Sequence, residues 1–241
     1  MSGILLIARR DFGAYLNSFW GWLILALALG IDGLFFNVIG IGKSAKYSAE
    51  VLDQFFFGTG GVTLAVAVLI TMRLFAEERQ TGTIVLLETS PLSDRQLVLG
   101  KYLSAMAFVS LFLALTAYLP AMIFINGKVS TEEILVGYLG TWLLGSAGVA
   151  IGTWASAVSR YQVLAAVLAA VVTVFFVVCW MLSGILDAPF KGVISYVAFF
   201  DRQFAPFQGG SLNTEGVVFF LSITFGFLLM ATQSLCSRRW T

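Results

Sequence analysis

Residues 76–96 read AEERQTGTIVLLETSPLSDRQ and lie between two long apolar runs. The segment carries six charged side chains, which makes it too polar to cross a bilayer. Its central run, Ile84 to Leu87, is too apolar for a bare loop. The pattern therefore predicts a short helix at the membrane surface that is available to a soluble partner. The alternative is an ordinary charged connector between two membrane spans.

The composition of the rest of the chain indicates a membrane protein. The 241 residues are 59% hydrophobic and only 11% charged, whereas soluble domains are about 25% charged. Several apolar runs reach 18 residues or more, so we predict an all-α, polytopic membrane protein surrounded by lipid. The net charge of +1 gives no indication of a nucleic-acid partner.

Two classes of chemistry are disfavoured by the residue types. The chain has no histidine, which excludes histidine-based acid–base catalysis and histidine metal sites. The two cysteines, Cys179 and Cys236, have no metal-ligand spacing. We therefore predict neither a catalytic residue nor a metal site.

Hydropathy and helix breakers predict one transmembrane domain, residues 1–241, with six spans. The spans are about 19–40, 54–75, 97–125, 133–157, 162–186 and 216–236. Each is long enough for a hydrocarbon core about 30 Å thick at 1.5 Å per residue. Capping-box patterns open two of them, Ser93 with Gln96 for the third and Ser130 with Glu133 for the fourth.

The amino-terminal segment has the pattern of an interfacial helix. Apolar residues recur at three- and four-residue spacings over residues 3–18. They are Ile4, Leu5, Ala8, Phe12 and Tyr15. A plain extension of the first span is the alternative.

The distribution of Lys and Arg predicts the orientation. Nine of these residues fall on the side of the amino terminus and five on the other. We therefore expect both termini, and residues 76–96, to be cytoplasmic. The longest outer segment, about 187–215, is rich in aromatic residues and can dip back into the membrane where protein buries its backbone.

Two features inside the spans are candidates for functional or packing roles. Asp32 is an acidic residue well inside an apolar span, and such residues mark transport pathways by default. The alternatives are a position near outer water or pairing with a polar neighbour such as Asn37. In the glycine-rich fourth span, Gly145, Gly148 and Gly152 predict close helix packing, since Gly148-x-x-x-Gly152 is a small-xxx-small pair.

Residues 77–92, from Glu77-Glu78-Arg79 through Gly82-Thr83 to Pro91-Leu92, and the following Gly100-Lys101, resemble the cytoplasmic signature of type-2 ABC exporter permeases. Residues 9–18, which begin Arg-Arg-Asp-Phe, are similar to the helix that precedes the first span in that family. The expected order of six spans, with both ends inside, agrees with the topology of that family. Within the family, the chain resembles the gliding-motility and copper-nitrous-oxide-reductase maturation permeases.

The resemblance implies a permease subunit in the bacterial cytoplasmic membrane that works with a second permease subunit, identical or homologous. A separate ATP-binding cassette subunit would dock on each copy, and a periplasmic partner could be added. The residues implied in docking are Glu77, Glu78, Arg79, Gly82, Thr83, Leu87, Glu88 and Pro91.

The chain itself is not expected to be an enzyme. It has no Gly-x-x-x-x-Gly-Lys-Ser/Thr loop, so ATP and magnesium would bind to the partner subunit. The alternative function is a channel or secondary transporter that uses Asp32. A membrane enzyme is disfavoured because the sequence contains no nucleophile elbow or metal pair.

Overall fold

A computed structural model describes residues 2–41, 47–83, 93–126, 129–185 and 190–238. The structure is 88% helical, and the described residues form no strand. Six stretches of helix in this part of the chain are long and apolar enough to cross a membrane. The predicted all-α, polytopic membrane fold is therefore confirmed.

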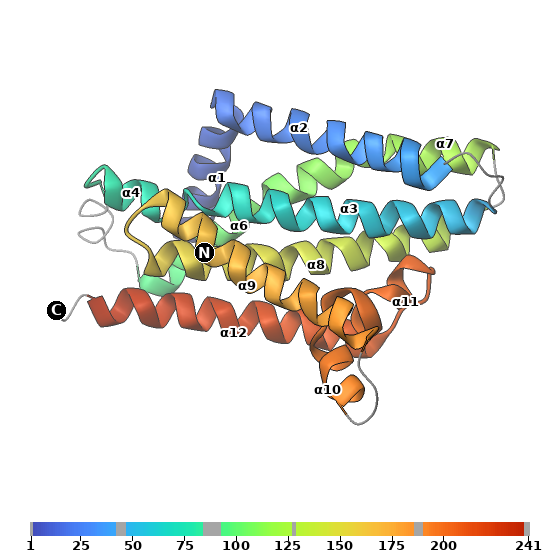
Figure 1. Ribbon diagram of the computed structural model, residues 1–241. Helices are drawn as coiled ribbons and strands as arrows, with labels where there is room; N and C mark the ends of the chain where they lie inside the picture. Colours follow the sequence, from blue (N-terminus) through green and yellow to red (C-terminus); the bar gives the residue numbers. More distant parts are fainter. Residues whose placement is uncertain (1, 42–46, 84–92, 127–128, 186–189, 239–241) are drawn as a thin grey trace.

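The elements follow one another as helices joined by short connections (Figure 1). They are α1 (Ser2–Leu16), α2 (Phe19–Phe35) with its π-helical continuation (Phe36–Ile41), α3 (Ser48–Thr71), α4 (Ala76–Gln80), α6 (Asp94–Thr116), α7 (Tyr118–Asn126), α8 (Thr131–Val158), α9 (Gln162–Ser183), α10 (Phe190–Val197), a π-helical turn (Phe199–Gln203), α11 (Ala205–Gln208) and α12 (Thr214–Arg238).

Two helices differ in detail from the predicted spans. The second span begins at Ser48 instead of residue 54, because the helix continues beyond the apolar run through a turn that contains Glu50. The third is interrupted at Ala117, where α6 gives way to α7. Both predicted capping boxes are present, and each serine accepts a hydrogen bond from the backbone N–H three residues later.

Helix α8 lies at the centre of the bundle and packs against α3, α6, α9 and α12 (Figure 1). Its glycines face α3 at close range. A Cβ atom on Gly148 would lie 2.9 Å from the Leu64 side chain, and one on Gly152 would collide with the Thr71 side chain. A Cβ atom on Gly145 would lie 2.9 Å from the methyl group of Thr63. The two backbones approach this closely because α8 has no side chains at these positions.

Helix α1 crosses the bundle at a steep angle to α2 (Figure 1). It packs against α6, where Gly100 leaves room for Ile7: a Cβ atom at Gly100 would lie 2.9 Å from the Cβ of Ile7. Ile7 and Tyr15 are buried, but Leu5 is 62% exposed. The predicted helix is present, and its packing on α6 buries the stripe that contains Ile7 and leaves Leu5 exposed.

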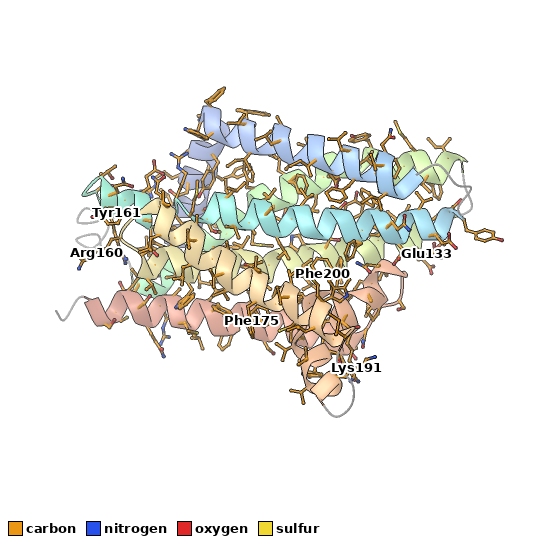
Figure 2. All side chains as sticks on the ribbon, viewed as in Figure 1. Glu133, Arg160, Tyr161, Phe175, Lys191 and Phe200 are labelled. Atoms are coloured by element: carbon orange, nitrogen blue, oxygen red, sulfur yellow. The ribbon has the colours of Figure 1, made fainter. Side chains whose placement is uncertain are left out.

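The two ends of the bundle differ. Figure 1 shows α1, α4 and the last turn of α12 at one end, which we call the α4 end, and α10 and α11 at the other, the α11 end. At the α11 end, the aromatic segment before α12 packs into the bundle, because Phe199, Phe204 and Phe207 are fully buried. Lys191 and Glu133 lie near this end, and Arg160 and Tyr161 lie near the α4 end (Figure 2).

Candidate functional site

The candidate site is centred on a break in the helix between α3 and α4. Residues 72–75 form a turn, which leaves backbone groups without helical partners. The Ser156 hydroxyl of α8 accepts hydrogen bonds from the N–H groups of Phe75 and Ala76, at 3.0 and 3.2 Å. The Lys101 ammonium of α6 donates to the carbonyl oxygen of Leu74 at 2.6 Å. Neighbouring helices therefore satisfy the interrupted backbone, as burial in or near a membrane requires.

The charged side chains of α4 are engaged within the chain. Glu77 forms a two-pronged ion pair with Arg73, with N–O distances of 2.7 and 2.8 Å. Glu78 lies 2.8 Å from the ammonium of Lys101. Arg79 donates to the carbonyl oxygen of Ser159, directly after α8, at 3.0 Å. These contacts fix α4 to α6 and α8.

The end of α4 forms the exposed part of the site. Gly82 adopts a φ of +74°, a left-handed conformation that a residue with a Cβ rarely adopts. No described residue restricts space there, so the positive φ is the reason for glycine in the described structure. The hydroxyls of Thr81 and Thr83 donate to the carbonyls of Glu77 and Glu78, at 2.9 and 3.3 Å. Residues 80–83 are all exposed. The predicted docking residues Leu87, Glu88 and Pro91, and the run from Ile84 to Leu87, lie outside the described residues.

Lys101 joins this site to the amino-terminal helix. Its side chain is only 2% exposed. Besides Glu78 and the Leu74 carbonyl, it contacts the Asp11 carboxylate of α1 at 3.2 Å and lies 5.2 Å from the centre of the Phe75 ring. We call Lys101, Asp11, Glu78 and the Leu74 carbonyl the Lys101 cluster.

The sequence analysis assigned no site role to Lys101, Asp11 or Ser156. A lysine near the start of an apolar span is itself a signal, because intramembrane charges are rare and need partners. In the sequence, Lys101 contributes to the charge bias and to the family resemblance, and Asp11 to the resemblance alone. Ser156 gives no such signal, since buried serines are common in packed membrane helices.

Asp32 lies between α2 and α3 and is 1% exposed. Its Oδ1 atom accepts a hydrogen bond of 2.8 Å from the Thr59 hydroxyl. Its Oδ2 atom is buried and has no hydrogen-bond partner among the residues that the structure describes. The partner is therefore on the neighbouring helix, and the sequence had suggested Asn37 instead. One carboxylate oxygen remains available for a further interaction.

An apolar groove of about 710 Å³ opens between α2, α3 and α9. Its walls include Ile31 and Phe35 of α2, Val62 of α3 and Val174 of α9. Asp32 is not among the lining residues, because it points to the α2–α3 contact. The groove therefore presents an apolar surface, and Asp32 is enclosed beside it.

A family model described as ABC-2 family transporter protein matches residues 32–194, about two thirds of the chain. The chain belongs to this family. The match includes the α3–α4 break, Lys101, Ser156 and Asp32, and it begins after α1. A search for similar individual curated proteins finds no match.

Membership in the ABC-2 family supports a permease subunit of an ABC transporter. Members of the family are typically non-catalytic membrane subunits that work with an ATP-binding cassette partner in a separate subunit. Together with the six apolar helices, membership identifies a multi-pass membrane protein. It does not select a subgroup among the type-2 permeases.

Proposed function

We propose that this chain is the permease subunit of an ATP-driven exporter, or of a complex that transmits ATP-driven motion. The ATP-binding subunit docks on residues 80–83 and the segment that follows them. The observation that carries this proposal is the arrangement of α4. Glu78 is held by Lys101 of α6 and Arg79 by the carbonyl directly after α8, while the turn at the end of α4 is exposed. A docked subunit would therefore contact a segment fixed to the core of the bundle.

The α4 end is the cytoplasmic end in this proposal. The basic residues in its described part, among them Arg9, Arg10, Arg79 and Arg160, support that orientation. Both termini are then cytoplasmic, and the membrane is the bacterial cytoplasmic membrane. ATP and magnesium bind to the partner subunit, because this sequence contains no phosphate-binding loop.

A second permease subunit, identical or homologous, completes the transporter. The groove between α2, α3 and α9 supports this, since it is open, apolar and about 710 Å³ in volume. Asp32 is enclosed beside the groove and would reach a transport path when α2 separates from α3. Close packing at Gly145, Gly148 and Gly152 keeps α8 and α3 together as that occurs. A periplasmic partner could bind at the α11 end. The resemblance supports the gliding-motility and nitrous-oxide-reductase maturation subgroup.

The test is copurification of the tagged full-length chain with the ATP-binding subunit of its source organism, followed by an ATPase assay. We expect a subunit with a phosphate-binding loop in a fixed ratio to the permease. Gly82→Val should reduce the amount that copurifies, because valine disfavours the left-handed turn by about 1–2 kcal/mol. Gly192→Val, on exposed helix α10 at the other end, is the matched control, since its added Cβ meets no atom within 4 Å. Equal copurification with both variants would contradict docking at this turn.

A further inference from the structure

We propose that Lys101 is a positioning residue that transmits displacement of α4 to α1 and α6 during the ATP cycle. The inference rests on the proposed docking of an ATP-binding subunit at α4 and specifies how that docking reaches the rest of the bundle. It assigns one role to residues that lie up to 90 positions apart in the chain.

The geometry makes Lys101 the meeting point of three elements. Its ammonium lies 2.8 Å from Glu78 on α4, 3.2 Å from Asp11 on α1 and 2.6 Å from the Leu74 carbonyl in the α3–α4 turn. Its own backbone belongs to α6, and its side chain is almost completely buried. The ammonium donates hydrogen bonds to Asp11 and to the Leu74 carbonyl and forms an ion pair with Glu78. Arg10 of α1 also pairs with Asp11 and Glu78, so two cations balance the two carboxylates.

The break in the helix explains why such a link is needed. A continuous helix would carry motion from α4 into α3 through its backbone hydrogen bonds, but residues 72–75 interrupt that ladder. Displacement of α4 moves Glu78 and the Leu74 carbonyl. Because separation of a buried ammonium from its carboxylates is strongly unfavourable, Lys101 and Asp11 follow.

The packing of α1 on α6 extends the movement. Gly100, next to Lys101, allows Ile7 of α1 to approach the α6 backbone closely. Asp11 is one helical turn further along α1 and reaches the ammonium from the same side. The ion pair and the close packing together make α1 and α6 respond as one unit, which places the amino-terminal helix in the cycle.

The experiment follows α1 by electron spin resonance in the complete complex with its ATP-binding subunit, in lipid nanodiscs. Spin labels are attached to cysteines at Leu6, which is 70% exposed on α1, and at Ser237, exposed near the end of α12, in a background without native cysteines. In the otherwise wild-type complex, ATP with vanadate should change the distance between the labels. In Lys101→Met the change should fall at least two-fold, while the ATP-binding subunit still copurifies and hydrolyses ATP.

Matched variants separate coupling from folding. Lys101→Arg keeps the cation and should retain the distance change, and Lys191→Met, near the other end, should leave it intact. If Lys101→Met does not fold because the carboxylates lose one of their two cations, the charge-balanced variant Lys101→Met/Glu78→Gln replaces it and leaves the Arg10–Asp11 ion pair. Loss of the distance change in that variant, with ATP hydrolysis retained, supports the inference.

Two results overturn the inference and leave the proposed function intact. They are a full distance change in Lys101→Met or in Lys101→Met/Glu78→Gln, and a wild-type complex that hydrolyses ATP without movement of α1. If no ATP-binding subunit copurifies with the wild-type chain, the proposed function fails, and this inference fails with it.

Discussion

Replacement of Gly152 by alanine tests the close contact between α8 and α3. The added Cβ atom would collide with the hydroxyl oxygen of Thr71 and would lie 2.7 Å from its Cβ and 3.2 Å from its methyl group. Contacts this short force the helices apart, and overpacking of this kind costs about 1–3 kcal/mol. For a chain of this size the loss corresponds to roughly 2–12 °C in Tm.

The assay is thermal unfolding in mild detergent, followed by the loss of the monodisperse peak in size-exclusion chromatography. Gly226→Ala on α12 is the matched control, because its Cβ would meet no atom within 4 Å. It should keep the Tm or raise it, since alanine is favoured over glycine in helices by about 1 kcal/mol. Thr71→Ala removes the colliding hydroxyl and methyl groups, so the double variant should have a higher Tm than Gly152→Ala alone. An equal Tm for Gly152→Ala and Gly226→Ala would refute the reasoning.

Three further predictions follow from the contacts of single residues. Asp32→Asn should leave assembly intact, because asparagine still accepts the hydrogen bond from Thr59. It should reduce the coupling of ATP hydrolysis to transport, because asparagine carries no charge. A coupling ratio equal to that of the wild type would contradict a role of Asp32 in transport. Ser156→Ala should lower the stability by about 1–3 kcal/mol in thermal unfolding, because two N–H groups of the α3–α4 turn lose their acceptor, and an unchanged Tm would contradict this. In a cysteine-free background, a cysteine at Asn213 should react with an impermeant maleimide added outside, whereas one at Ser93 should not; the reverse pattern would overturn the proposed orientation.

The local features of the fold were predictable from the sequence. Apolar run length determines which segments can span a bilayer, and capping residues act within four positions of a helix start. For that reason the all-α membrane fold and the capping boxes at Ser93 and Ser130 were predicted correctly. The start of α3 at Ser48 was missed, because hydropathy locates the membrane-embedded part of a helix and not its polar extension.

Long-range polar contacts could not be predicted in the same way. The family resemblance implies docking roles for Glu78 and Arg79, and the structure shows their partners within the chain, Lys101 and the Ser159 carbonyl. A charged residue in a connector gives no information about which distant helix lies beside it. The buried Asp32 was conspicuous in the sequence, but its partner Thr59 was identified only by the packing of α2 on α3.

The hydrogen bonds around the α3–α4 break connect the proposed docking segment to the bundle by necessity. A helix that stops and restarts leaves N–H and carbonyl groups that must find partners when water is excluded. Here Ser156 of α8 satisfies the N–H groups of Phe75 and Ala76, and Lys101 of α6 satisfies the Leu74 carbonyl. A displacement of α4 therefore either moves α6 and α8 with it or leaves buried polar groups unpaired. Because the second outcome is unfavourable for each group, force applied at the exposed turn is directed into the central helix of the bundle.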